Sequence, residues 1–503
     1  MRLSLCMIAR DNEATIRRCL ESIRPWVDEM IVVDTGSSDT TPKIAEECGA
    51  SVSFFPWCDD FSAARNVSFE KASGEWLFWM DTDDYIPPHC GRLLRGIAEG
   101  SHAPDILGYG VQVHCPGDVE GDLTIVDHVK LVRNHPAIRF EFRIHEQLLP
   151  SIRRLGGDVA RSNVYVVHEG SRPTPEMRAH KRERDLRILA KEVEDRPNHP
   201  FALFNLGMTH SDLGNHELAC QFLERCLAVS DINESQVPKA IALLVGSLAA
   251  LGRYDQAARA CEQGIDTFND DIELWFRYAI VLNDLDRVDE AISAYQRVIS
   301  IPNQQRFRSV DPGVGTYKAM FNLSMLLRHH GRASHAESLL REAIRCNPLW
   351  APAHQKLVEV LLEGRKFNAA EIALEAFQKT LPNEELLTYV EGRRLEAQGD
   401  IEAARDKFAT LLQSNALDSE SLESLGRFFF EHGPDDQAVI VLSRLAESRP
   451  SDGAPWHNLG AVQIRLGMLD AARDSLERSL ALRPDAHHTR TLIEQLVVSA
   501  ESV

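Results

Sequence analysis

One spacing constrains the fold of this 503-residue chain more than any other feature: alanines recur at a fixed interval through its second half. From Ala336 onward the next four follow at steps of 34 residues, and three earlier alanines lie in matching contexts. A glycine lies five residues before the alanine in six of the eight cases. The eight positions are Ala219, Ala257, Ala291, Ala336, Ala370, Ala404, Ala438 and Ala472. A constant period of this length is the signature of a repeated supersecondary unit.

Each unit is interpreted as two helices joined by a tight turn. The glycine supplies a positive φ where the first helix ends, and small residues let the two helices approach closely. Such small residues recur in the first helices as Leu206-Gly207, Leu425-Gly426 and Leu459-Gly460. One hairpin can bury its apolar face only against its neighbours, so the units stack into a solenoid. We predict eight repeats of the tetratricopeptide type, with a loop over Asn303 to Gly315 where one step lengthens to 45 residues.

The first half has another rhythm, in which short apolar runs alternate with stretches of helical spacing. This alternation predicts βαβ units and a mainly parallel sheet. Strands are expected first at Leu3 to Ala9, Met30 to Asp34, Ser51 to Phe55 and Glu75 to Asp81, and later at Ile106 to His114, Thr124 to Arg133 and Val159 to Val167. Helices are expected near residues 12–24, 39–48 and 60–72.

A charged helix from about Glu176 to Arg196 should lead into the repeats. We therefore expect two domains, an α/β domain over residues 1–195 and an all-α solenoid over 196–503. The apolar amino terminus is interpreted as a first strand and not as a signal peptide, because Arg10-Asp11-Asn12-Glu13 stands where a cleavage site would be needed.

Bulk properties exclude several classes of protein. The net charge of −20 argues against a general nucleic-acid binder and against docking on anionic lipid. No apolar run approaches the roughly 18–20 residues of a transmembrane helix. The ten cysteines are scattered without a CxxC pair, which predicts reduced thiols and a cytoplasmic protein.

An acidic motif, Asp81-Thr82-Asp83-Asp84, follows the apolar run that ends at Met80. Carboxylates this close repel one another, and a bound cation would remove the repulsion. A solvated acidic turn is the alternative. Open α/β sheets bind ligands at the carboxyl ends of their strands, where this motif is expected to lie. The sequence contains neither a strand followed by GxGxxG nor a GxxxxGK[ST] motif, so it supports neither a Rossmann dinucleotide site nor a P-loop.

Three blocks together resemble a known family. They are Val33 to Asp39 (VDTGSSD), Trp57 to Asn66 (WCDDFSAARN) and Trp79 to Asp84 (WMDTDD). In order and spacing they look like family 2 glycosyltransferases of the GT-A fold, and specifically like the bacterial, sublancin S-glycosyltransferase-like branch that joins this domain to tetratricopeptide repeats. The resemblance covers roughly residues 1–195. It implies an inverting transferase that uses a nucleotide-sugar donor, usually a UDP sugar, and a divalent metal.

The resemblance also implies roles for residues near the donor. Asp34 matches the family position that contacts the nucleobase or ribose, and a carboxylate can accept a hydrogen bond from either. Glu13 and Asp39 are further candidates for that pocket, although Asp39 could instead be a helix cap. Arg65 matches the family's Ala-Arg-Asn arginine and could serve the base carbonyl or the diphosphate. A surface salt bridge on its helix is the alternative for Arg65.

Metal and base candidates follow from the same comparison. Asp83 is expected to coordinate Mn²⁺ or Mg²⁺, because both ions prefer hard oxygen ligands. Asp81 is expected to bind the ribose or a metal-bound water. His168 could be a further ligand of the metal or diphosphate, or a structural residue at a strand end. Glu146, in a segment that resembles the family's Arg-x-His-Glu, is the candidate general base. The alternative for Glu146 is a structural ion pair with Arg143 or Arg139.

These residues predict a metal-dependent glycosyltransferase whose repeats present a protein or peptide acceptor in their groove. A first alternative is an enzyme that acts on a saccharide or lipid-linked acceptor in surface polysaccharide assembly, with the repeats used for homo-oligomerisation or recruitment. A second is a non-catalytic repeat scaffold.

Overall fold

The computed structural model describes residues 2–116, 123–168, 175–302, 311, 313–381, 383–414 and 417–500, with the side chains of 175–180 and 497–500 left aside. Its contacts divide the chain into two compact units, Met1–Leu326 and Leu327–Val503. Unit 1 holds a sheet with its helices and the first helical hairpins, whereas all the regular elements described in unit 2 are helices. The domain boundary expected at residue 195 stays a prediction.

Eight strands form one sheet in the described part of unit 1, in the order β3-β2-β1-β4-β7-β6-β8-β5. The first four pair in parallel, and β6 and β8 are also parallel, whereas β7 and β5 pair antiparallel with their neighbours. The strands are β1 Leu3–Ala9, β2 Glu29–Asp34, β3 Ser51–Phe54, β4 Trp76–Trp79, β5 Asp84–Tyr85, β6 Ile106–Pro116, β7 Leu123–Arg133 and β8 Asp158–His168. The sheet is therefore parallel on one side and mixed on the other.

The seven strands expected from the sequence are confirmed, and most of their ends agree within one residue. β4 is the main exception, since it ends at Trp79 and not at Asp81. A turn follows, closed by a hydrogen bond of 3.2 Å from the backbone nitrogen of Asp84 to the carbonyl oxygen of Asp81. The sequence did not predict β5, which has only two residues.

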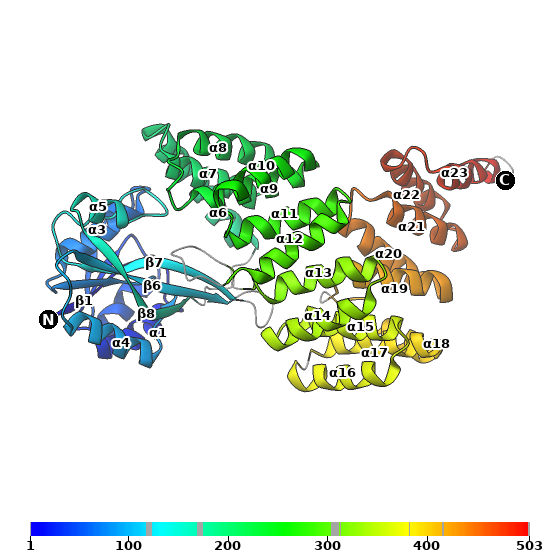
Figure 1. Ribbon diagram of the computed structural model, residues 1–503, viewed down its shortest axis with the longest axis horizontal. Coiled ribbons are helices and arrows are strands. Elements are labelled where there is room, and N and C mark those ends of the chain that lie inside the picture. The colour runs from blue at the N-terminus through cyan, green and yellow to red at the C-terminus, as the bar shows by residue number, and fades with distance from the viewer. Residues whose placement is uncertain are drawn as a thin grey trace. The chain divides into compact units, whose positions relative to one another are not determined.

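Helices cover both faces of the sheet (Figure 1). Alternate residues of β1 enter different cores: Leu5 and Met7 pack with Leu20 and Leu94, and Cys6 packs with Phe69 on the opposite face. Burial on both faces explains why these strands appear in the sequence as continuous apolar runs. The helices of this part are α1 Ile16–Ile23, the 3-10 helix η1 Arg24–Trp26, α2 Thr41–Glu47, α3 Phe61–Lys71, α4 Pro88–Glu99, α5 Leu149–Arg154 and α6 Pro175–Asp195.

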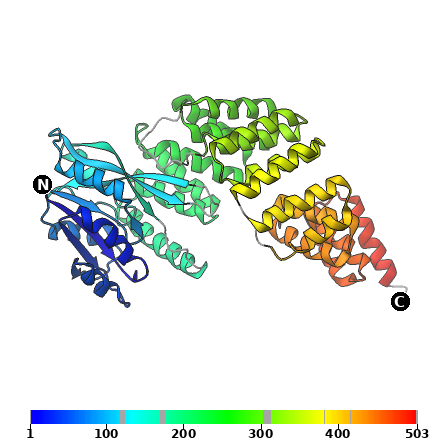
Figure 2. The ribbon, with the colours of Figure 1, turned by 90° about the horizontal axis from the view of Figure 1, so that it is seen from below.

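Eight helical hairpins follow within the described residues, as the alanine spacing predicts. Figure 2 shows those of unit 2, coloured yellow-green to red, as successive helix pairs. The pairs are α7 Pro200–Asp212 with α8 His216–Val229, α9 Val237–Ala250 with α10 Tyr254–Thr267, α11 Ile272–Asp284 with α12 Val288–Ser300, α13 Tyr317–His329 with α14 Ala333–Cys346, α15 Ala351–Glu363 with α16 Phe367–Thr380, α17 Glu384–Gln398 with α18 Ile401–Ala409, α19 Ser419–His432 with α20 Asp435–Ser448, and α21 Gly453–Arg465 with α22 Leu469–Leu482. α23 His487–Ala500 ends the series.

The repeated residues occupy the positions that their chemistry requires. All eight alanines lie in second helices and are 0% exposed. The six turn glycines all have positive φ, between 61° and 88°. In the two repeats that lack the glycine, Asp286 and Arg365 take its place with φ of 59° and 53°. The turn is thus conformationally fixed in every repeat, even where its residue is poorly suited to it.

Two further predictions bear on this region. The loop expected over Asn303 to Gly315 falls largely on residues 303–310 and 312, which lie outside the described residues. Across the helices that are described, none is both long enough and apolar enough to cross a bilayer.

Substituting glycine for Arg365 should stabilise the protein. An L-residue pays roughly 1–2 kcal/mol for a left-handed conformation, whereas glycine does not, so after glycine's loss of chain entropy we expect a gain of up to about 1 kcal/mol. Chemical denaturation of Arg365→Gly and of the parent protein measures the difference in their free energies of unfolding. Lys366→Gly is the matched control: Lys366 has φ of −90°, so glycine there should destabilise. Equal effects of the two substitutions would contradict the explanation.

Candidate functional site

The strand ends predicted to bind a donor begin with Asp34 at the end of β2. Its carboxylate is 6% exposed and accepts hydrogen bonds from the backbone nitrogens of Gly36 at 3.0 Å and Ser37 at 3.1 Å. Gly36, with φ of 110°, lets the chain turn back around the carboxylate. Asp34 therefore orders the loop after β2 at the edge where the sequence places it.

Glu13 and Asp39 join the loops that follow β1 and β2. The carboxylate of Glu13 accepts from the hydroxyl of Thr40 at 2.7 Å, and that of Asp39 accepts from the backbone nitrogen of Glu13 at 3.1 Å. Asp39 also accepts from the backbone nitrogen of Thr41, the first residue of α2, at 2.9 Å. This last hydrogen bond supports the interpretation of Asp39 as a cap of α2. The donor-binding role of both Glu13 and Asp39 stays a prediction.

Arg65 ties the acidic motif to the candidate base. Its guanidinium donates through Nη2 to Asp81 Oδ1 at 2.6 Å and through Nε to Glu146, and it lies 4.3 Å from the centre of the Trp79 ring. Arg65 is buried, and its Nη1 has no hydrogen-bond partner among the described residues. Burial opposes the charged guanidinium, but Asp81 and Glu146 outweigh it and raise the pKa of Arg65. A buried donor without a partner suits an oxygen of a ligand.

These contacts decide between alternatives that the sequence left open. Arg65 is a buried residue of α3 and not part of a surface salt bridge. Glu146 does form an ion pair, but with Arg65, whereas Arg143 pairs with Asp195 at 2.8 Å. The ion pair expected for Glu146 thus has another partner, Arg65, and the role of Glu146 as a base stays a prediction.

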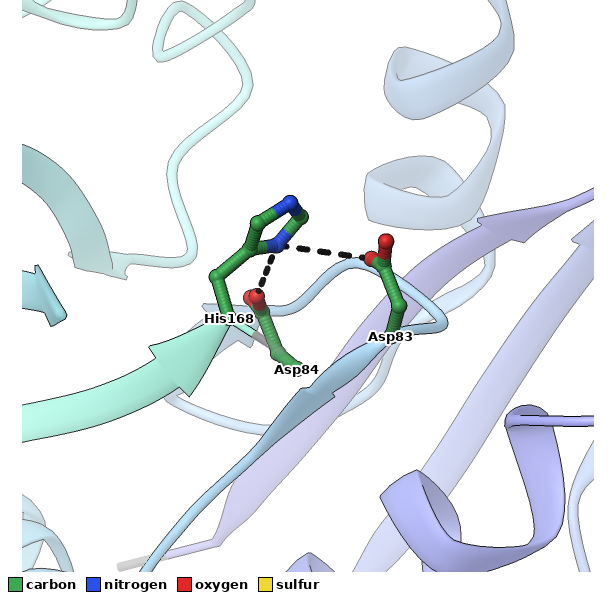
Figure 3. A group of neighbouring side chains, drawn as sticks. All are labelled: Asp83, Asp84 and His168. Atoms are coloured by element: carbon green, nitrogen blue, oxygen red, sulfur yellow. Dashed lines mark hydrogen bonds and ion pairs between the residues drawn. The ribbon is translucent and has the colours of Figure 1, made fainter. Parts of the chain in front are cut away.

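A second group forms where β5 pairs with β8, because that pairing sets Asp84 directly opposite His168. Nδ1 of His168 lies 2.9 Å from Asp84 Oδ1 and 3.5 Å from Asp83 Oδ1. Figure 3 draws both contacts as dashed lines that meet at the imidazole ring. The hydrogen bond to Asp84 raises the pKa of His168 despite its burial. For Asp83, burial is the largest effect and raises the pKa of its carboxyl group.

The chemistry of this group fits a divalent cation. Asp83, Asp84 and His168 each offer one ligand atom, and these atoms all lie within 4.8 Å of one another. Two carboxylate oxygens and one imidazole nitrogen form a donor set that Mn²⁺ accepts and that Mg²⁺ accepts less readily. Asp81, which is expected to bind the ribose or a metal-bound water, contacts Arg65. That role of Asp81 near the metal stays a prediction.

Lys130 on β7 is a member of the site that sequence reasoning missed. It is 1% exposed, and its Nζ lies 2.9 Å from Asp84 Oδ2, 3.9 Å from Asp81 Oδ2 and 3.8 Å from the centre of the Trp79 ring. Burial alone would raise the pKa of Asp84, yet Lys130 and His168 outweigh it and lower that pKa. A single lysine within the apolar run Val129 to Val132 was the available signal.

The site opens into a cavity of about 710 Å³. The residues that line it around the acidic motif are Arg65, Trp79, Asp81, His128, Lys130, Glu146 and His168. The other end is formed by α6 and the first hairpins, with Asp185, Phe201, Phe204, Asn205, Met208, Lys239, Asp271 and Glu273 among its residues. Asp34, Glu13 and Asp39 do not line this cavity. The residues predicted to bind the nucleoside are therefore separate from the cavity that Glu146 faces.

Comparisons with known proteins match different parts of the chain to two families. The glycosyl transferase family 2 model matches residues 4–120, and tetratricopeptide repeat models match residues 202–233, 248–309, 389–455 and 454–486. The family 2 match includes Asp81, Asp83 and Asp84 but ends before Lys130 and Glu146.

Three relatives share parts of the chain. A TPR repeat-containing protein of Synechococcus elongatus is 30% identical over 350 residues, which cover 69% of this chain and 76% of that protein. The SPbeta prophage-derived glycosyltransferase SunS of Bacillus subtilis is 25% identical over 229 residues, covering 44% of this chain and 52% of SunS. A putative glycosyltransferase of the same bacterium, EpsH, is 38% identical over 101 residues, 18% of this chain and 29% of EpsH.

Replacing Lys130 with methionine should destabilise unit 1. Removal of one member of a buried ion pair leaves a charge buried without its partner, at a cost of about 3–5 kcal/mol. Denaturation of Lys130→Met measures this cost, and Lys43→Met, at an exposed lysine of α2, is the matched control. Adding Asp84→Asn to Lys130→Met should recover part of the loss, because the unpaired charge is then removed. No recovery would mean that packing, and not charge, accounts for the effect.

Proposed function

The chain belongs to the family of proteins that join a family 2 glycosyltransferase domain to tetratricopeptide repeats, and from this premise we propose the reaction and its participants. We propose that this glycosyltransferase moves a sugar, with inversion, from a UDP sugar to a protein or peptide acceptor. The observation that carries the proposal is that Arg65, Lys130, Glu146 and His168 line one cavity, and that His168 lies next to Asp83 and Asp84.

The nucleoside end of the donor is assigned to the loops after β1 and β2. Asp34 would accept a hydrogen bond from the uracil or the ribose, with Glu13 and Asp39 framing the same loops. Supporting this, ligands of such sheets bind at the carboxyl ends of the strands. The diphosphate would then extend toward the acidic motif, where Nη1 of Arg65 is a buried donor without a partner among the described residues.

The divalent ion, Mn²⁺ or Mg²⁺, would be held by Asp83, Asp84 and His168, with Asp81 near it. When bound there, it supplies positive charge against the diphosphate that leaves during transfer. The remaining chemistry belongs to the chain. Lys130 keeps Asp84 ionised and in place, and Arg65 does the same for Asp81, so the acidic motif is preorganised before the donor arrives.

Glu146 is proposed as the general base. It lines the cavity, and its ion pair with Arg65 holds the side chain in place beside the acidic motif. The acceptor atom attacks the anomeric carbon opposite the departing diphosphate, the sugar–phosphate bond breaks, and the acceptor's proton passes to Glu146. A single displacement of this kind inverts the configuration at the anomeric carbon.

We also propose a cytoplasmic location, because the cysteines form no disulfides. All ten cysteines are free, and most of them are buried among apolar residues. Thiols in this number stay reduced in a reducing compartment.

Asp83→Ala should abolish stabilisation by donor and metal. A ligand that binds the native state at a hundred times its Kd adds about 2.7 kcal/mol of stability. Thermal unfolding with UDP sugars and Mn²⁺ measures the rise in Tm, and Asp105→Ala, at an exposed aspartate before β6, is the control that should retain it. The same rise in Asp83→Ala, or in excess chelator, would refute the metal site.

Glu146→Gln should lower turnover while leaving donor binding in place. Loss of a general base costs about 10²–10⁴-fold in rate, whereas the amide can still accept from Arg65. Release of UDP during donor hydrolysis measures turnover with water as the acceptor. Glu141→Gln is a matched control, because Glu141 lies in the same segment and pairs with Arg154 but does not line the cavity. Equal rates in the two variants would remove Glu146 from the mechanism.

A further inference from the structure

The loop that carries Glu146 has a strained backbone. Phe142 and His145 have φ of 73° and 55°, although neither is a glycine. The backbones of Glu141 and Gln147 bond to each other at 2.9 and 3.0 Å and close this Glu146 loop, residues 141–147. Left-handed residues other than glycine cost energy and persist only where the surrounding structure enforces them. Contacts with the rest of the protein are therefore needed to keep the Glu146 loop in its conformation.

Arg143, between the two left-handed residues, is held at three points. Its backbone nitrogen donates to the carboxylate of Glu192 at 2.7 Å, and its carbonyl oxygen accepts from the backbone nitrogen of Phe61 at 2.7 Å. Its guanidinium donates to Asp195 at 2.8 Å. Glu192 and Asp195 belong to α6, whereas Phe61 begins α3. Two helices that are distant in the chain therefore fix the residue three positions before the proposed base.

Glu192 makes the stronger of the two contacts from α6. Its side chain is buried, and its second carboxylate oxygen lies 3.4 Å from Nε of Arg196. A hydrogen bond to a charged acceptor is roughly twice as strong as one between neutral groups. The side chain of Asp195 is by contrast 54% exposed, and ion pairs of exposed side chains contribute little. Glu192 is therefore the residue of α6 that holds the Glu146 loop.

α6 is itself anchored to the loop before α3 by a buried carboxylate, that of Asp59. This carboxylate accepts from Nη2 of Arg187 at 3.0 Å and from Nζ of Lys191 at 2.6 Å, both on α6, and from the indole nitrogen of Trp57 at 3.0 Å. An apolar cluster reinforces the contact, and its members include Trp57, Phe61, Ile144, Ile188 and Leu189. The first half of the block WCDDFSAARN, for which the sequence suggests no role, thus docks α6.

The start of the Glu146 loop is held by α3. The side chain of Asn66 donates to the carbonyl oxygen of Phe140 at 3.0 Å and accepts from its backbone nitrogen at 2.8 Å. Asn66 follows Arg65 in the chain, and Arg65 bonds to Glu146 itself. α3 therefore holds both ends of the path to the proposed base, and α6 holds its middle. Loss of the α6 contact would free the amide of Arg143, which lies between the two left-handed residues.

We infer that Glu192 is a positioning residue for the proposed base: through the backbone of Arg143 it keeps the Glu146 loop in the conformation that sets Glu146 against Arg65. The inference rests on the proposed function and adds α6 to the parts of the chain that turnover requires. Glu192 is not among the described residues that line the cavity, so its effect passes through the loop and not through contact with donor or acceptor.

Glu192→Ala in the full chain tests the inference. Without an acceptor for the Arg143 amide the loop should relax and displace Glu146, and a displacement of about 1 Å can cost about a hundredfold in rate. We expect kcat for release of UDP, measured with Mn²⁺ and the UDP sugar that most stabilises the parent, to fall about tenfold or more. The KM for the UDP sugar should stay unchanged. Glu192→Gln keeps an acceptor oxygen and should restore most of the turnover.

Hydrogen exchange read by mass spectrometry supplies a second measurement that needs no activity. The Arg143 amide should exchange about tenfold faster or more in Glu192→Ala, and at nearly the parent rate in Glu192→Gln. Glu194→Ala is the matched control, because Glu194 is exposed on the same helix, and it should leave turnover and exchange unchanged. Arg187→Met combined with Lys191→Met removes both links to Asp59 at exposed side chains and should change turnover and exchange in the same direction as Glu192→Ala.

Thermal unfolding verifies that each variant is folded, and if Glu192→Ala is not, the double variant on the exposed face of α6 decides. Unchanged exchange or unchanged turnover in Glu192→Ala would overturn the inference. Equal losses in Glu194→Ala, or a loss in Glu192→Gln as large as in Glu192→Ala, would also overturn it. Glu146→Gln, measured alongside, reports on the proposed function: a loss there with none in Glu192→Ala keeps the base and removes the positioning role, whereas parent turnover in Glu146→Gln removes the base.

Discussion

The site depends on one buried guanidinium. Arg65 extends from α3 between a carboxylate at the end of β4 and another in the segment before α5, and it lies against the Trp79 ring. A cation at this depth is tolerable only because two carboxylates compensate it. The same contacts place Asp81 and Glu146, which are 65 residues apart in the chain, on either side of one group. The acidic motif and the proposed base thus share a single anchor.

The three aspartates of the motif have different surroundings although they are neighbours in sequence. Asp81 faces Arg65, Asp84 faces Lys130, and Asp83 has His168 at 3.5 Å. Two of the three are held by cations of the chain itself, which removes most of the repulsion that the motif would otherwise create. Asp83 is the carboxylate that this compensation reaches least, and burial raises its pKa.

Local patterns were sufficient to predict most of the fold. Strand ends, the turn glycines and the buried alanines follow from periodicity and from the conformations that each residue type allows. The site could be predicted only in part, because its contacts cross long stretches of chain: Arg65 to Glu146, and Asp84 to His168, depend on the order of the strands. Lys130 was missed because the role of a single charged residue in an apolar strand cannot be inferred until its partner is known. Asp286 and Arg365 could not be predicted from their residue types either. They adopt a positive φ because the packing of the repeat overrides the conformation that their residue types favour.

The two-residue strand β5 has a consequence for how this domain can vary. Side chains alternate along β8, so a slip of one residue against β5 would turn His168 to the opposite face of the sheet. Insertions or deletions between the middle of β8 and its last residue would therefore separate His168 from Asp83 and Asp84. The two-residue pairing of β5 with β8 thus limits the changes in chain length that keep Asp83, Asp84 and His168 together.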